Sequence, residues 1–486
     1  MKKIILILII LLLPSVTFGA TYYVTEAGAG AATGADLANA SAVATFNAGT
    51  APYDALDGDT VYFCDTLTTG ITVPDGGADA TTNVVTLRGD YAAHACTLNA
   101  MGTGITNNGK NYVVMNGFTA NATTTVAYKI YGGAVGVILN DCAITGGCVD
   151  GVQIATNSTS VTFNRLTITG NFTNALRIGV AAAGTFTATF NTVTIDGTGG
   201  STAANYVVNQ SAEGSTCTIN DMTVSNLFAT SVAANILNAN GSLTLDGLNY
   251  TGLGAGDNCQ AIQATGATSY IYVYDSIIHD SPDSAIGNIA SGQIPVVSRC
   301  KFYNNVDHAI HLITVGTTRV DNCLFYQLGS AKYGIRVETA GATAYITNCT
   351  FDDTTAGAAG DGCGLRMAIA AGQMYAWNCN FTGLAYGIYQ SAGTLVNTNS
   401  CMYAVTTPTT GTVTNTNVFT SDPVYTAAGS DYTLTSASPY KDSGLPNYHI
   451  QLYPTDIALS AMPQGEGYPI GCYEYVESGR IYGTIQ

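Results

Sequence analysis

The stretch "YITNCTF" at residues 345–351 has near copies elsewhere in the chain: "VVSRCKF" at 296–302, "RVDNCLF" at 319–325 and "YAWNCNF" at 375–381. Each copy places a cysteine two residues before a phenylalanine, and successive copies start 23 to 30 residues apart. A repeat of this length indicates a structural unit that packs against the next one. The register of the repeat then determines which residues of successive units lie at equivalent positions.

The same two positions can be followed through eleven copies at a mean spacing of about 26 residues. Most of the residues that occupy them are apolar. From the C-terminal end backward, the pairs are Cys379/Phe381, Cys349/Phe351, Cys323/Phe325, Cys300/Phe302, Ser276/Ile278, Leu248/Tyr250, Met222/Val224, Val193/Ile195, Leu166/Ile168, Cys142/Ile144 and Phe118/Ala120.

Within each copy, apolar and polar residues alternate with a period of two, as in "VTFNRLTI" (161–168) and "ATFNTVTI" (188–195). This is the spacing of a strand whose side chains point alternately to two faces. A second short apolar segment follows about ten residues later, as in "YGIRV" (333–337) and "CGLRM" (363–367), after turns rich in Gly, Asn, Asp and Ser.

One unit of about 26 residues cannot bury its apolar face alone, whereas stacked units can. The LxxLxLxxN frame of leucine-rich repeats and the three-and-four spacing of helical repeats are both missing. The sequence therefore predicts an all-β fold, a right-handed parallel β-helix of three sheets and roughly thirteen coils with a cap at each end. The expected N-terminal cap lies in "ADLANASAVATFNA" (35–48), with Leu37, Val43 and Phe46 facing inward.

The expected organisation depends on where the period begins and ends. Residues 1–19 combine two lysines, an apolar run and small residues, which is typical of a secretory signal peptide. The cap and first coils are expected in 20–110, the central repeats in 111–395, and the last coils with the C-terminal cap in 396–486. No later apolar run is long enough to cross a membrane, so we expect a secreted, extracellular or periplasmic protein.

The composition narrows the choice of partners. Acidic residues outnumber basic ones by 32 to 15, and the net charge of −17 repels nucleic acid. Because a β-helix is filled with side chains, any ligand must bind to residues that point outward. An extracellular polysaccharide or other glycan is the expected partner.

The chain also resembles a known group of proteins. "LDGDTVYFC", "NVVTLRGDY" and "NYVVMNGFT" near the N-terminus, and the ending "DYTLTSASPYKDSG…IGCYEY", are similar to bacterial secreted β-helix proteins of the pectate-lyase-like superfamily. The ending matches that group at Ser438, Pro439, Asp442, Gly444, Ile470, Gly471, Tyr473, Glu474 and Tyr475. The resemblance implies the β-helix fold, but its members include lyases, hydrolases, esterases and adhesins, so it does not imply one activity.

The thirteen cysteines are an odd number and include no CxxC pair. Those at 300, 323, 349 and 379 occupy an inward strand position, which other coils fill with Leu, Val or Met. We therefore interpret them as a buried column in the core. Disulfides between neighbouring coils, and a metal-binding or catalytic thiol, are the alternatives.

The polar residues that could carry chemistry lie on the second strand of each coil. His311, Arg336 and Arg366 occupy one outward position in successive coils, and Lys332 precedes Arg336 by four residues. A polysaccharide lyase needs a cation to neutralise the uronate carboxylate and a base to remove the adjacent proton. We assign the first role to Arg336 and Arg366 and the second to His311 or Lys332.

Five more residues complete this candidate site. His308, Glu338 and Tyr389 are expected to contact the substrate. Asp283 and Asp307 lie four residues before the outward position of their coils and are candidate ligands for Ca²⁺, the one cofactor that the sequence suggests. Alternatively, these two carboxylates could be the pair of a glycoside hydrolase.

Other interpretations of this patch remain open. Stacked outward charges can simply solubilise a sheet, and the known activity signatures of pectate lyases, polygalacturonases and pectin esterases are missing. The leading hypothesis is a secreted protein that interacts with extracellular polysaccharide, either as a lyase or glycoside hydrolase or by binding alone. The alternative is a non-catalytic structural or adhesive β-helix protein.

Overall fold

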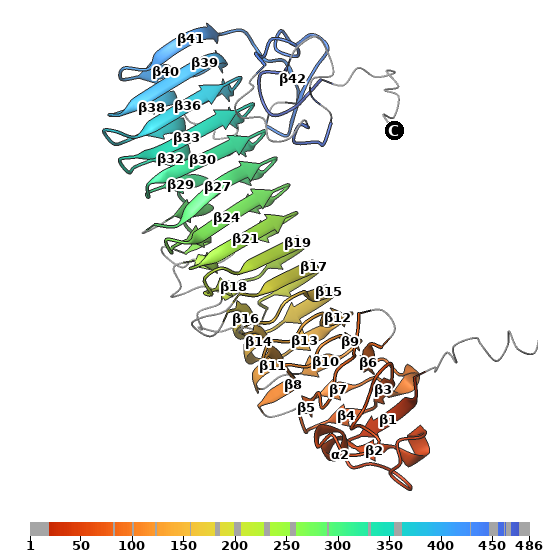
Figure 1. Cartoon of the computed structure of the whole chain (residues 1–486). Coiled ribbons are helices and arrows are strands. Elements are labelled where there is room, and N and C mark those ends of the chain that lie inside the picture. Colours follow the sequence, from red (N-terminus) through yellow and green to blue (C-terminus); the bar gives the residue numbers. More distant parts are fainter. Residues whose placement is uncertain are drawn as a thin grey trace, which may run out of the picture.

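A computed structural model shows an elongated stack of coils that rises from the N-terminal end to the C-terminal end of the chain (Figure 1). It describes residues 19–80, 83–99, 102–121, 124–155, 157–179, 185–198, 206–227, 234–252, 259–288, 291–328, 332–353, 362–427, 429–446, 455–460, 462 and 468–475. The expected signal peptide lies outside the described residues, apart from Gly19.

The coils pair through three ladders of parallel strands, as predicted. The strands that belong to the first ladder alone are β1 (Thr21–Thr25), β2 (Ser41–Ala42), β3 (Thr60–Phe63), β6 (Val85–Arg88), β9 (Val113–Asn116), β12 (Ile138–Asn140), β21 (Gly241–Asp246), β24 (Ser269–Tyr274), β27 (Gln293–Ser298), β30 (Gly316–Asp321), β33 (Ala342–Thr347), β36 (Gln373–Trp377) and β41 (Thr414–Phe419). The strands that belong to the second ladder alone are β4 (Thr66–Leu67), β7 (Thr97–Leu98), β10 (Thr119–Asn121), β13 (Ala143–Thr145), β22 (Asn249–Thr251), β25 (Ile277–His279), β28 (Lys301–Tyr303), β31 (Leu324–Tyr326), β34 (Thr350–Asp352) and β37 (Asn380–Thr382).

Four long strands run through both of these ladders and join them into one sheet: β15 (Val161–Thr169), β17 (Thr187–Asp196), β19 (Thr216–Ser225) and β39 (Thr394–Tyr403). The third ladder is a separate sheet of fourteen strands, close to the roughly thirteen coils expected. Its strands are β5 (Ile71–Thr72), β8 (Thr103–Asn108), β11 (Thr124–Tyr131), β14 (Cys148–Ile154), β16 (Phe172–Ile178), β18 (Tyr206–Gln210), β20 (Ala234–Asn238), β23 (Gln260–Ala264), β26 (Ile286–Asn288), β29 (Ile310–Leu312), β32 (Tyr333–Val337), β35 (Cys363–Met367), β38 (Tyr386–Gln390) and β40 (Thr407–Thr410).

The register of the core column is confirmed in every coil in which it was predicted. Ala120 pairs with Ile144, and the pairing continues without a slip through each predicted position up to Phe381. The rings of Phe325 and Phe351 stack with centroids 4.6 Å apart, and Phe302 and Phe381 extend the column below and above. This interior stack is fully buried, so it excludes water from the middle of the solenoid.

The cysteines of the repeat sit at the corner between the first and second ladders. The residue before each one has a left-handed backbone: φ is 53° at Asn322 and 51° at Asn348. Asparagine tolerates this conformation better than most residues. The Cys349 thiol then donates to the carbonyl of Thr347 at 3.3 Å, and equivalent bonds form at positions 300, 323 and 379. Because Leu, Val and Met fill the same position in other coils, the thiol bond is compatible with a site whose main requirement is apolar volume.

Short helices are found near the N-terminal end, and none of the helices in the described ranges is long and apolar enough to cross a membrane. Helix α2 (Val43–Asn47) buries Val43 and Phe46, and Phe46 contacts the ring of Phe63 edge-on at 4.9 Å. Leu37 is only partly buried, in the short 3₁₀ helix η1 (Leu37–Asn39); a second one, η2 (Ala92–His94), comes later in the chain.

The C-terminal segment leaves the solenoid and folds back beside it (Figure 1). It contains the antiparallel pair β42 (Tyr425–Ala427) and β43 (Asp431–Leu434). Its side chains pack on the outside of the second ladder, where Tyr432 and Cys472 join Leu324 in a small buried cluster. We call the described residues from 421 to 475 the strap.

All thirteen cysteines are free and buried, so the structure favours the core column over disulfides between coils. Burial raises the pKa of the Cys300 and Cys349 thiols well above the usual value. Because the thiolate is the nucleophile, these residues are poorly suited to catalysis.

We predict that the folded protein reacts very slowly with a thiol reagent and that about thirteen thiols become reactive after unfolding without reductant. A colorimetric thiol count before and after denaturation measures both numbers. About eleven reactive thiols or fewer in the unfolded, unreduced chain would mean that at least one pair is oxidised, contrary to this structure.

Candidate functional site

The outer face of the third ladder carries two adjacent columns of side chains. In each coil, two small or apolar residues point inward, as Gly334 and Ile335 do, and the residues on either side of them point outward. The first column contains, in register, Gly287, His311, Arg336, Arg366 and Tyr389. The predicted alignment of the last four is therefore found in the structure.

The second column lies three residues earlier in each coil. Tyr333 pairs with Cys363, which in turn pairs with Tyr386. His308 precedes His311 by the same three residues, as Tyr333 precedes Arg336. Tyr333, Cys363 and Tyr386 were missed in the sequence, although the fragments "YGIR" and "YGIY" repeat the spacing that identifies them.

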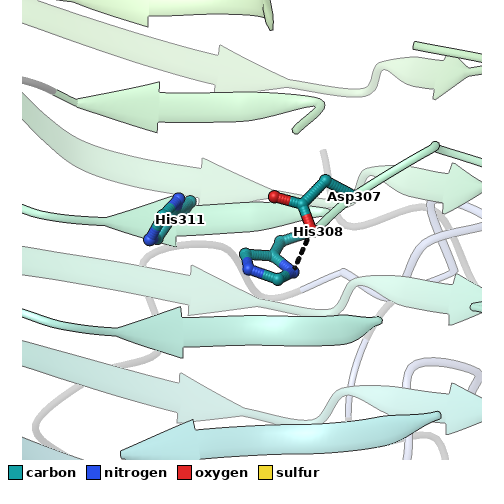
Figure 2. Close-up of side chains that lie close together, drawn as sticks. All are labelled: Asp307, His308 and His311. Atoms are coloured by element: carbon teal, nitrogen blue, oxygen red, sulfur yellow. Dashed lines mark ion pairs between the residues drawn. The ribbon is translucent and has the colours of Figure 1, made fainter. Parts of the chain in front are cut away.

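The two columns meet in a chain of polar contacts. The ring nitrogen Nδ1 of His308 lies 3.1 Å from Asp307 Oδ1 (Figure 2). Its Nε2 accepts a hydrogen bond from Arg336 Nη1 at 2.9 Å. Arg336 also donates to Glu338, whose other oxygen lies 2.9 Å from His311 Nε2. Five side chains from two neighbouring coils are thus held in one chain of contacts, Asp307–His308–Arg336–Glu338–His311.

Aromatic rings organise the upper part of the site. The Arg366 guanidinium lies 4.7 Å from the centroid of the Tyr333 ring and 5.4 Å from that of Tyr389. It also donates a hydrogen bond to the Tyr333 hydroxyl. His308 also packs against Tyr333, and the centroids of their rings lie 4.8 Å apart. Arg366 is therefore held between two tyrosines rather than free in solvent.

The electrostatics keep His308 uncharged. Its side chain is only 2% exposed, and burial together with His311, Arg336, Lys332 and Arg366 lowers the pKa of His308 to about 2. A neutral imidazole whose Nε2 accepts from Arg336 carries its proton on Nδ1, toward Asp307. The tautomer is therefore set by the guanidinium on one side and the carboxylate on the other.

The carboxylates respond in opposite directions. Burial, and then the charge of Asp283, raises the pKa of Asp307 although Lys332, His311 and Arg336 oppose the shift. Partial burial also acts to raise the pKa of Glu338, but the hydrogen bonds from His311 and Arg336 hold it below its usual value. Glu338 is thus the carboxylate that stays ionised, and Asp307 is the one closer to accepting a proton.

Three residues of this cluster are close enough together to share a metal ion. The nearest ligand atoms of Asp307, His308 and His311 all lie within 4.8 Å of one another. Both ring nitrogens of His308 already face other groups, however, and a metal on Nδ1 would leave a protonated Nε2 pointing at Arg336. Calcium also prefers oxygen ligands over imidazoles. His308 is therefore a poor metal ligand here, and the cations around Asp307 suit an anionic ligand. The expected Ca²⁺ site at Asp283 and Asp307 stays a prediction.

One comparison with known proteins bears on the architecture. Residues 206–400 match the family model described as "Right handed beta helix region". No curated protein matches this chain in sequence. Together with the parallel ladders, the family model shows that the chain folds as a right-handed β-helix.

The solved structures that match this chain are distant from it in sequence. "Crystal structure of pectate lyase Pel9A" is 12% identical, covering 95% of this chain and 98% of that chain at a TM-score of 0.29. "Azotobacter vinelandii Mannuronan C-5 epimerase AlgE4 A-module" is 10% identical, covering 74% and 90% at 0.35. "The complex structure of XylC with xylose" is 8% identical, covering 94% and 99% at 0.38.

The depressed pKa of His308 predicts a loss of stability in acid. Between about pH 2 and the ordinary histidine pKa of 6.5, the unfolded chain binds a proton on this histidine that the folded chain does not. Its contribution is therefore complete above pH 6.5 and falls below it by at most about 1.4 kcal/mol per pH unit. Denaturant unfolding from about pH 7.5 to about 4.5 measures the slope.

We expect His308→Gln to make that slope shallower, whereas His94→Gln, at a half-exposed histidine beside Asp65, should keep it. If the two variants and the wild-type protein lose stability in parallel on acidification, His308 is not the buried neutral group described above.

Proposed function

We propose that the outer face of the third ladder from β26 to β38 binds an acidic polysaccharide outside the cell and cleaves it by β-elimination. The observation that carries the proposal is the meeting of Arg336 and Arg366 around Tyr333, beside a histidine oriented by Glu338. The proposal rests on these contacts and on the chemistry that they allow, not on the distant structural matches.

Binding would depend on the cations of this face. Guanidinium groups match carboxylates in shape and charge, so Arg366 is placed to pair with a uronate carboxylate while its tyrosine neighbours contact the sugar ring. Lys332 adds a second positive charge nearby. Because the chain as a whole is strongly acidic, its remaining surface repels an acidic polymer and confines binding to this site.

His311 is the group best placed to act as the base. Its Nε2 faces the ionised carboxylate of Glu338, which favours the tautomer with the proton on Nε2 and the lone pair on Nδ1. This carboxylate would also stabilise the imidazolium that forms when His311 takes a proton. His308 cannot share the role, because its own lone pair is used by Arg336.

The reaction can be written so that its atoms and electrons balance. His311 removes the proton from the carbon next to the carboxylate, while Arg366 stabilises the negative charge that develops on the carboxylate. The electron pair forms a carbon–carbon double bond and the glycosidic carbon–oxygen bond on the next carbon breaks. Tyr333, whose hydroxyl contacts Arg366, donates its proton to the departing oxygen, and protons exchanged with water restore both residues.

One observation favours hydrolysis as a second candidate. Asp307 has a raised pKa and is influenced by the charge of Asp283, and two carboxyls with different proton affinities are what a glycoside hydrolase requires. In that case Asp307 would be the acid and Asp283 its partner. The two reactions differ in their products, since only elimination leaves a double bond.

The test is incubation of the purified protein with a panel of uronate-containing and neutral polysaccharides. Ultraviolet absorbance reports unsaturated products, and a reducing-end assay reports hydrolysis as well. We expect both signals on a uronate polymer, and a fall in kcat of about 10² to 10⁴ for His311→Ala, the loss typical of a missing general base.

Matched variants separate catalysis from folding. Tyr333→Phe keeps the ring beside Arg366 but removes the proton donor, so it should lower kcat more than it raises KM. Arg177→Ala removes an arginine from the same outward column, several coils away and paired with Asp150, and should leave the activity unchanged. Polymer binding without any product would support a non-catalytic adhesive role, and no binding to any polymer would refute the proposal.

A further inference from the structure

Lysine and arginine occupy only a short part of the outer face of the third ladder. Arg336 and Arg366 lie in register on β32 and β35, and Lys332 immediately precedes β32. No lysine or arginine occurs in residues 178–298 or in residues 367–440. The other basic residues between these two ranges lie on the first two ladders or at the corner that joins them: Arg299, Lys301 and Arg319. This face therefore has no further lysine or arginine for several coils below, or in the coils above.

Below these cations the face is neutral or acidic. Gly287 lies under His311 in register and has no side chain, and Gln263, under Gly287, is only 4% exposed. Asp283 and Asp307 border the same level. Burial, followed by the charge of Asp283, raises the pKa of Asp307. A second carboxylate bound over Gly287 would therefore meet two aspartates of its own charge sign.

Above the cations the face is aromatic and then polar without charge. Tyr389 follows Arg366 in register, and Thr410 on β40 follows Tyr389. Tyr386 pairs with Thr407 in the same way, and all four of these side chains are partly exposed. The rings of Tyr386 and Tyr389 meet edge to face with centroids 5.6 Å apart. Rings and hydroxyls can contact the faces and hydroxyls of a neutral sugar, but they do not neutralise a carboxylate.

The charge of Arg336 is balanced within the protein, whereas that of Arg366 is not. Arg336 donates to the carboxylate of Glu338. Within the described ranges no carboxylate forms an ion pair with Arg366, which lies against the rings of Tyr333 and Tyr389. Neighbouring strands lie about 4.8 Å apart, so a polymer that follows the column places about one sugar residue over each coil. Only the residue over Arg366 then meets an arginine that has no carboxylate partner.

We propose, on the premise that this face binds and cleaves an acidic polysaccharide as described above, that the polymer carries single uronates among neutral sugars instead of a uronate at every position. Arg366 takes the carboxylate of the residue that reacts. The neutral sugar above it contacts Tyr389 and Tyr386, and a neutral sugar below lies over Gly287. The acidic surface of the rest of the chain acts against a polymer that carries a carboxylate on every residue.

The experiment compares unsulfated polymers that differ in how often a uronate occurs. Polygalacturonate and alginate carry a uronate at every residue, hyaluronan at every second residue and gellan at every fourth. Elimination at the uronate of any of them leaves a double bond that absorbs ultraviolet light. We expect kcat/KM per uronate to be about tenfold higher on hyaluronan or gellan than on either homopolymer, because like charges brought together at a binding face weaken the wrong complex.

A cation placed one coil above Arg366 tests the same proposal from the side of the protein. Tyr389→Lys adds a positive charge where a homopolymer has its next carboxylate and hyaluronan has a neutral residue. It should raise the ratio of kcat/KM on polygalacturonate to kcat/KM on hyaluronan by about tenfold. Tyr389→Gln is the matched control: it removes the same ring without adding a charge, so it should lower kcat/KM on both polymers and leave the ratio unchanged.

Equal or faster cleavage of polygalacturonate or alginate would overturn this choice of polymer and leave the proposed cleavage intact. An unchanged ratio in Tyr389→Lys would do the same. Electrophoresis of the protein through gels that contain each polymer measures binding separately from cleavage. Binding without cleavage in the expected order of preference would support the polymer class and refute only the elimination, whereas no binding and no cleavage of any polymer would refute both.

Discussion

Parallel backbone pairing of each coil with the next is the interaction on which the rest of this structure depends. Every coil must present its N–H and C=O groups at the same heights and in the same directions as its neighbours, or those groups are left without partners. Backbone pairing therefore fixes the register of each coil relative to the previous one, and a side chain in one coil lies above its counterpart in the coil before. His311, Arg336 and Arg366 can form a site because this constraint brings residues about 25 to 30 apart in sequence into one column.

The same constraint explains why the chain repeats asparagine followed by cysteine. A coil can turn sharply between the first and second ladders only if one residue adopts a left-handed conformation, and the turn brings a carbonyl close to the side chain that follows. Asn348 adopts this conformation, and the thiol of Cys349 donates to the carbonyl of Thr347. Ser276 and Ser400 make the same bond from a hydroxyl, and other coils fill the position with Leu, Val or Met, so the position serves packing rather than sulfur chemistry.

Features that depend on the repeat period could be predicted from the sequence. Alternation along the strands and the spacing of Phe351 and its counterparts indicated the register of the core, and that register predicted the alignment of Arg336 with Arg366. The partners of His308 could not be predicted in this way, because they depend on which rotamers fill the space between two columns. The path of the strap could not be predicted either, because the residues after β41 carry no repeat, although Asn378 binds Leu445, which lies 67 residues further along the chain.

The strap and the candidate site occupy the same coils. Asn322, whose side chain donates to the carbonyl of Thr455 in the strap, lies between the strands that carry His311 and Arg336, and Asn378 lies between those that carry Arg366 and Tyr389. In a solenoid, each coil is stabilised mainly by its two neighbours, so a local opening spreads along the axis more readily than in a globular domain. A segment that bonds to several coils at once adds contacts that skip neighbours and oppose such openings. Because a catalytic or binding arrangement must hold its groups to within about 0.5 Å, the coils that carry the candidate site would gain most from this support.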